Sequence, residues 1–76
     1  MDFRLKLMSN GSVKMFPTSP QAKEWLKMLV LAGSHPEIAR GPIAGLYFWC
    51  DDRHAAGSWA GLARQERLKC PDPWTL

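Results

Sequence analysis

The 76-residue chain lacks most of the features that mark a secreted, disulfide-bonded or membrane-spanning protein. It has two cysteines, Cys50 and Cys70, which permit one disulfide but no framework of several bridges. The N-terminus, MDFRLKLMSN, has no long apolar segment of the signal-peptide kind, and no apolar run approaches the roughly 20 residues that cross a membrane. We therefore expect a cytoplasmic protein with two free thiols and no membrane partner.

The chain also has no internal repeat, no low-complexity segment and no change of composition that would mark a second domain. We expect one small domain over residues 1–76, with an extended C-terminal tail over residues 70–76. A domain this short buries only about 60% of the surface that its unfolded chain exposes. A deep ligand cavity would remove core that such a domain needs, so the length favours a protein that works through its surface.

Recognised signatures of metal sites and catalytic centres are missing as well. The densest cluster of reactive residue types is CDDRH over residues 50–54, and on a helix Cys50 and His54 would lie one turn apart. With His35 and Cys70 they could form a Cys2His2 zinc site, but the chain has neither a C-x2-C nor an H-x3-H spacing. The two adjacent aspartates would raise the pKa of the Cys50 thiol, which opposes its use as a nucleophile. We expect no metal, no cofactor and no catalytic residue.

The sequence does contain a clear β-hairpin pattern over residues 2–16. Apolar and polar residues alternate in FRLKL, and the dipeptide Asn-Gly that follows marks a turn. A two-residue loop would pair Leu7 with Lys14 and divide the apolar residues between the two faces. A three-residue loop over SNG, with its glycine left-handed at a bulge, pairs Leu7 with Val13 and places every strong apolar residue except Phe16 on one face. We prefer the three-residue loop.

The most legible helix runs from Thr18 to Gly33. Thr18 or Ser19 can cap its start, Pro20 fits its first turn, and Gly33 offers a left-handed stop. The run MLVLA near its end is apolar on all sides, so we expect the second half of the chain to cover that end from more than one direction. An apolar stripe at helical spacing is formed by Ala22, Trp25, Leu26 and Leu29.

The second half of the chain is less clear. Residues 34–41 are typical of a turn followed by a short helical turn. Residues 42–55 can form a helix that begins at Pro42, or a strand centred on the aromatic run LYFW; length and the proline favour the helix, whereas Gly45 weakens it. Residues 58–69 predict another helix, and the two prolines of the tail predict an extended end. Together the patterns predict an α+β fold, in which an N-terminal β-hairpin packs on one principal helix and one or two short helices follow.

The charged residues are scattered along the chain. Ten Lys and Arg residues against seven Asp and Glu residues give a net charge of +3, which suits mild attraction to acidic partners without demanding nucleic acid. A positive rim around the hairpin and the principal helix would suit the acidic patch of a protein partner, and a hairpin edge could pair with a partner's strand. This rim consists of Lys6, Lys14, Lys23 and Lys27.

The aromatic residues supply further candidates for binding. Four Trp, three Phe and one Tyr are a large aromatic load for this length, and exposed aromatic residues are frequent interface anchors. Trp74, which follows two prolines, and Trp59 are the candidate anchors; filling of the small core is the alternative for both. Arg64, Arg67 and Lys69 of the last helix complete the candidate partner-binding set.

These observations favour a small non-catalytic protein-interaction module that binds a larger protein, with inhibition of that protein as a further expectation. Short chains without enzyme motifs are typical of accessory proteins of bacteriophages and other mobile elements, so we expect the partner to be a host protein or defence complex and the location to be the host cytoplasm. The alternative is a small nucleic-acid-binding protein, in which helices over residues 42–55 and 58–69 form a loose helix-turn-helix and present the basic C-terminal residues to phosphates or base edges.

Overall fold

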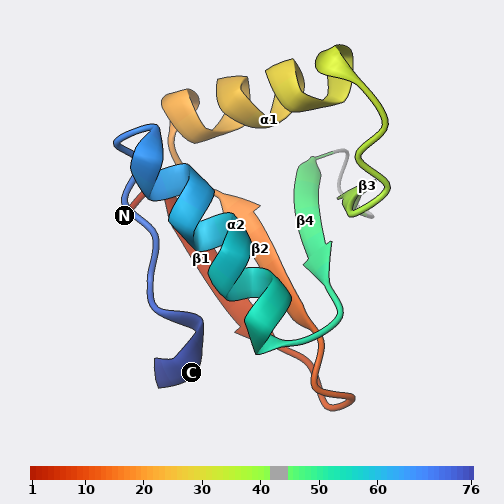
Figure 1. The fold of residues 1–76 in the computed structure, drawn as a ribbon, viewed down its shortest axis with the longest axis vertical. Helices are drawn as coiled ribbons and strands as arrows, with labels where there is room; N and C mark the ends of the chain where they lie inside the picture. The colour runs from red at the N-terminus through yellow and green to blue at the C-terminus, as the bar shows by residue number, and fades with distance from the viewer. Residues whose placement is uncertain (42–44) are drawn as a thin grey trace.

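A four-stranded antiparallel sheet packed against helices forms the fold (Figure 1). The computed structural model describes residues 1–41 and 45–76. The sheet has the order β1-β2-β4-β3, and α2 lies along one face while α1 runs across one end. The α+β prediction is therefore confirmed. The elements are β1 (Phe3–Leu7), β2 (Val13–Pro17), α1 (Pro20–Ala32), β3 (Ile38–Arg40), β4 (Leu46–Cys50), α2 (Arg53–Gln65) and the 3-10 turn η1 (Pro73–Thr75).

The hairpin has the register that the three-residue loop predicts. Leu7 pairs with Val13, and Leu5 pairs with Met15. Gly11 has a φ of 88°, a left-handed conformation that glycine adopts without strain. The loop is held by the side chain of Asn10, whose Oδ1 accepts hydrogen bonds from the backbone N–H and the hydroxyl of Ser12 at 3.0 and 2.7 Å.

The principal helix α1 begins as the sequence predicts but ends differently. Ser19 is its N-cap, and the Ser19 hydroxyl accepts a hydrogen bond from the backbone N–H of Ala22 at 3.1 Å. Gly33 has a φ of 160°, which is extended backbone, so the predicted left-handed stop is wrong. The prediction that the second half of the chain covers MLVLA is also wrong, since Met28 and Leu31 are 59% and 86% exposed.

Residues 46–50 form strand β4, so the helix that we favoured for residues 42–55 is wrong; residues 42–44 of that stretch lie outside the described part of the chain. The strand pairs with β2 on one side and β3 on the other, and these ladders satisfy its backbone groups. β3 likewise takes the place of the short helical turn predicted in residues 34–41. Because the described residues 46–50 form a strand, the predicted helix-turn-helix of residues 42–55 and 58–69 is wrong.

Helix α2 begins five residues earlier than predicted. Asp52 caps it by accepting a hydrogen bond from the backbone N–H of Ala55 at 2.9 Å. The tail is also not fully extended, because the Asp72 side chain accepts a hydrogen bond from the Trp74 backbone N–H at 3.0 Å and closes the turn η1. Small side chains let α2 approach the sheet closely, and those that are completely buried are Ala56, Ala60 and Ala63.

The N-terminal segment is tied to the segment that follows α2 (Figure 1). The backbone N–H of Asp2 donates to the Lys69 carbonyl at 2.8 Å, and the backbone N–H of Lys69 donates to Oδ2 of Asp2 at 2.6 Å. This second bond, helped by a hydrogen bond from the Ser19 side chain, lowers the pKa of the Asp2 carboxyl below its ordinary value of 3.8. Its contribution to stability is therefore present above that ordinary pKa and is lost as the pH falls through the lowered one.

Phe48 of β4 lies at the centre of the core. Its ring stacks on Trp59 of α2 at a centroid distance of 4.2 Å and an interplanar angle of 27°. It also contacts Trp25 of α1 at 5.8 Å and Phe3 of β1 at 6.4 Å. One strand residue therefore joins the sheet to both helices.

Candidate functional site: a basic groove on the open sheet face

The sheet face away from α2 carries aromatic and cationic side chains. Since side chains alternate along a strand, the residues between the core positions point to this open face. The register places Arg4 of β1 opposite Phe16 of β2, and Lys6 opposite Lys14. Tyr47 of β4 belongs to the same face, because its neighbour Phe48 points into the core. The open face thus carries both cations and rings on three strands.

Helix α1 turns this face into a groove of about 1130 Å³. Its inner side faces the core through Ala22 and Leu26, which are fully buried. A different side of the same helix, spaced at i, i+4 and i+8, lines the groove with Lys23, Lys27 and Leu31. The sheet contributes Phe16, Tyr47, Leu46 and the cations Arg4, Lys6, Lys14 and Arg40 to the lining.

The groove concentrates positive charge that the modest net charge conceals. Six of the ten Lys and Arg residues line it, and none of the seven Asp and Glu residues does so. Lys6 and Lys14 stand directly opposite one another on paired strands, an arrangement in which like charges repel and destabilise the sheet. Among the described residues, the one ion pair within 4.0 Å joins His35 to Glu37 and involves no Lys or Arg. The cations of the groove are therefore available to an anionic ligand.

The two rings in the groove form an ordered surface. Phe16 and Tyr47 stack with centroids 5.4 Å apart and an interplanar angle of 29°. Arg4 lies over the Phe16 ring at 5.6 Å, and the Nζ of Lys14 lies over the Tyr47 ring at 5.4 Å. Each ring of the stacked pair therefore has a cation beside it in the groove.

The structure brings together all four lysines of the predicted positive rim, Lys6, Lys14, Lys23 and Lys27. The sequence reasoning missed the two arginines and two rings beside them, Arg4, Arg40, Phe16 and Tyr47. A signal for part of this set was present: in the preferred hairpin register, Arg4, Lys6, Lys14 and Phe16 are the residues left on the face opposite the apolar one.

The candidate basic residues near the C-terminus lie outside this groove. Arg64 of α2 holds the tail by donating from Nη2 to the Cys70 carbonyl at 3.0 Å. Arg67 follows α2 in a left-handed conformation with a φ of 61° and is exposed, as is Lys69. None of the three lines the groove.

The two candidate tryptophans have different environments. Trp59 is partly buried and packs against the core cluster. Trp74 is 53% exposed on η1, with its ring edge-on to His54 at 4.9 Å and Arg53 above it at 6.0 Å. Trp74 is therefore the one of the pair whose ring a partner could reach.

Cys50 lies in the core, with its Sγ 3.9 Å from the Sδ of Met15. Burial above all, and then the nearby Asp51 carboxylate, raises the pKa of the Cys50 thiol to about 12. Burial also raises the pKa of the Cys70 thiol. The sequence correctly predicted a raised pKa for the Cys50 thiol, but from the nearby aspartates alone and not from burial, which is the larger cause. Neither thiol is ionised near neutral pH, and the thiolate is the reactive form.

We expect neither cysteine of the folded protein to react with Ellman's reagent at about pH 8, and both to react after denaturation. The comparison of titrations with and without guanidinium chloride measures this directly. Rapid reaction of one thiol in the native protein would contradict the burial and raised pKa described above.

In the described part of the chain, no three His, Cys, Asp or Glu residues are placed to hold a metal ion together. Across residues 1–41 and 45–76, neither helix has the length and apolar character needed to cross a bilayer. Comparison of the chain with protein-family models, curated proteins and solved structures finds no match.

Proposed function

We propose that this chain is a small non-catalytic binding protein that holds single-stranded nucleic acid in the basic groove. The main support for this proposal is that six cations and two stacked rings line the same groove. Among the described residues, no Asp or Glu side chain lines it. Proteins that bind single strands combine a positive groove, which follows the phosphates, with aromatic side chains on which bases stack. The open face has both components in the same place.

The shape and chemistry of the groove favour a single strand over other anionic ligands. A protein reads duplex DNA by inserting a convex element, such as a helix, into the DNA groove. This groove is itself the receiving surface, with α1 as one side and the sheet as the other. An acidic peptide would satisfy the cations but would offer no regular series of flat groups to Phe16 and Tyr47.

The proposal is tested by titrating fluorescent oligothymidylate of about 12 nucleotides and a duplex of the same length at about 50 and 200 mM salt. We expect the single strand to bind more tightly, with a slope of about −3 to −4 in a plot of log K against log salt concentration if four to six phosphates are neutralised. Absence of binding at the lower salt concentration, or equal affinity for the duplex, would contradict the proposal.

Replacement of Tyr47 by alanine should weaken binding of the single strand by about 10-fold, because one stacking contact of a base is lost. The matched control is Trp74→Ala, which removes an exposed ring outside the groove and should leave the affinity unchanged. Fluorescence anisotropy measures both. A larger loss from Trp74→Ala than from Tyr47→Ala would place the ligand on the C-terminal tail instead.

Binding and inhibition of a larger protein, the first function that the sequence suggests, stays a prediction, as do the phage or mobile-element origin and the cytoplasmic location. The exposed ring of Trp74 is the feature that favours it. The alternative prediction of nucleic-acid binding is retained in the present proposal, but on the sheet face in place of the C-terminal helices.

A further inference from the structure

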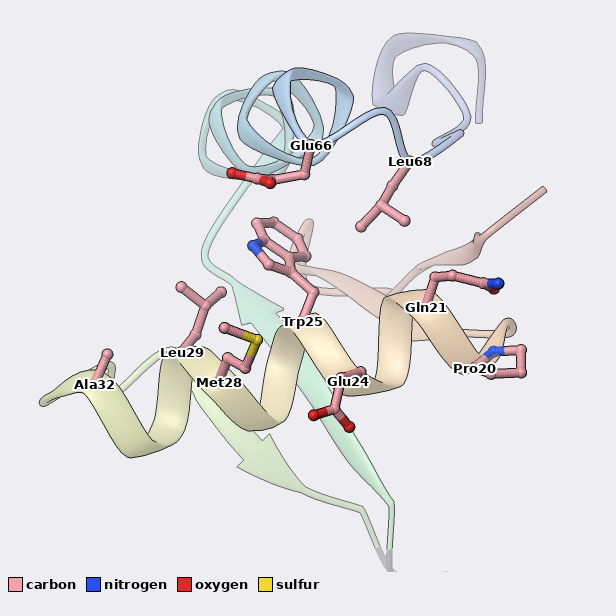
Figure 2. Close-up of a pocket in the computed structure, with 9 residues that line it drawn as sticks. All are labelled: Pro20, Gln21, Glu24, Trp25, Met28, Leu29, Ala32, Glu66 and Leu68. Carbon is pink, nitrogen blue, oxygen red and sulfur yellow. The ribbon is translucent and has the colours of Figure 1, made fainter.

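A second groove, of about 660 Å³, lies on the other side of α1, between this helix and the segment that follows α2 (Figure 2). Trp25 extends from α1 toward Leu68 and Glu66, which come from the opposite side. Met28, which also lines the groove, is 59% exposed. The complete lining is Pro20, Gln21, Glu24, Trp25, Met28, Leu29, Ala32, Glu66 and Leu68.

The way in which α2 ends shapes this second groove. The backbone N–H of Glu66 donates to the carbonyls of Leu62 and Ala63, and Arg67 then turns the chain with a φ of 61°. The backbone N–H of Leu68 donates a hydrogen bond to the Ala63 carbonyl at 3.0 Å, and Leu68 is only 9% exposed. The turn thus directs an apolar side chain inward and keeps the Glu66 carboxylate at the rim.

The charge of the second groove is opposite to that of the first. Its lining includes two carboxylates, Glu24 and Glu66, and no Lys, Arg or His. Neither carboxylate takes part in an ion pair within 4.0 Å among the described residues. The floor is apolar, and its largest side chains are Trp25, Met28, Leu29 and Leu68. An occupant must therefore be apolar in its middle and cationic at its sides.

We propose that this second groove binds a cationic amphipathic segment of a partner protein, with aliphatic residues along one side and Lys or Arg beside them. Apolar helices commonly bind in apolar grooves through residues spaced at i, i+3, i+4 and i+7. The 13 residues of α1 extend about 20 Å, which matches a partner helix of about four turns. Nucleic acid does not fit, because its phosphates would meet the two carboxylates.

This site is independent of the proposed function, because the two grooves share no lining residue. α1 separates them, with Lys23 and Lys27 on one side and Glu24 and Met28 on the other. A nucleic acid and a basic protein segment could therefore be held at the same time.

The test uses a fluorescent amphipathic helical peptide of about 14 residues built from leucine and lysine, with a leucine–glutamate peptide of the same pattern as the comparison. We expect the leucine–lysine peptide to bind and the leucine–glutamate peptide not to bind to this groove. Replacement of both Glu24 and Glu66 by glutamine should lower the affinity for the leucine–lysine peptide by about 5-fold or more. Met28→Ser should lower this affinity by about 10-fold, because apolar contact area is lost.

The matched control for charge is Glu37→Gln with Asp51→Asn, which removes two carboxylates outside the groove and should leave the affinity unchanged. The variant with Lys6 and Lys14 replaced by glutamine should also bind the peptide normally, which separates this test from that of nucleic-acid binding. Failure of the lysine peptide to bind, or equal affinity in the Glu24→Gln/Glu66→Gln variant, would overturn the proposal.

Discussion

Replacement of Lys6 and Lys14 by glutamine should weaken binding of single-stranded oligothymidylate on the order of 50-fold at about 50 mM salt. The two lysines face each other across β1 and β2 in the groove. Each phosphate contact with a single strand contributes about 0.7 to the salt slope, so the loss of two should reduce the slope by about 1.4. Titration by fluorescence anisotropy at several salt concentrations measures both quantities.

The control for this prediction is Arg67→Gln with Lys69→Gln, which makes the same change in net charge on exposed residues outside the groove. We expect its affinity to fall by less than about 2-fold. Because Lys6 and Lys14 repel each other, their replacement should also leave the midpoint of thermal unfolding unchanged or raise it. Equal losses of affinity in the two double variants would show that only the total charge matters and would contradict the role of the groove.

Replacement of Phe48 by alanine should lower the free energy of unfolding by about 4 kcal/mol. The ring is completely buried and contacts Phe3, Trp25 and Trp59, so its removal leaves a cavity bounded by side chains from the sheet and both helices. A domain of 76 residues has a total stability of roughly 4–11 kcal/mol. The variant should therefore be marginally folded or unfolded. Urea denaturation followed by circular dichroism provides the measurement.

Leu31→Ala is the matched control, because Leu31 is also a large apolar residue but is 86% exposed. Its effect on the free energy of unfolding should lie within about 0.5 kcal/mol. If Phe48→Ala lowered the free energy of unfolding as little as Leu31→Ala, the central position of Phe48 in the core would be contradicted.

The first half of the fold could be predicted because its signals are local. The Asn-Gly turn and the alternation on both sides of it fix the hairpin register. The structure has the predicted pairing of Leu7 with Val13. Ser19 and Pro20 define the start of α1 by capping chemistry that involves only neighbouring residues. In both cases the interactions that decide the structure lie within a few positions of the chain.

The second half could not be predicted in the same way because distant residues decide it. Residues 46–50 contain apolar side chains at every position, so neither a period of 2 nor one of 3.6 is visible. They form a strand because β2, more than thirty residues earlier in the chain, supplies one ladder of hydrogen bonds and β3 supplies the other. The pairing of β4 between them, and with it the sheet order, is a property of the whole chain.

The basic groove could be predicted only in part, because residues that are distant in the sequence form it. The hairpin register alone separates Lys6 and Lys14 from the apolar residues, and the helix pattern places Lys23 and Lys27 one turn apart. Tyr47 joins Phe16 only when β4 pairs beside β2, and Arg40 joins the groove only through β3. A site assembled from four strands and a helix cannot be read from residues that are scattered along the sequence.

The most direct test of the central claim is a nuclear magnetic resonance titration of the isotope-labelled protein with oligothymidylate, followed through the backbone amide signals. We expect the largest chemical-shift changes on β1, β2 and β4 around Lys6, Lys14, Phe16 and Tyr47, with little change over Arg64–Lys69. Changes concentrated on Arg64–Lys69, or no changes at all, would contradict that claim.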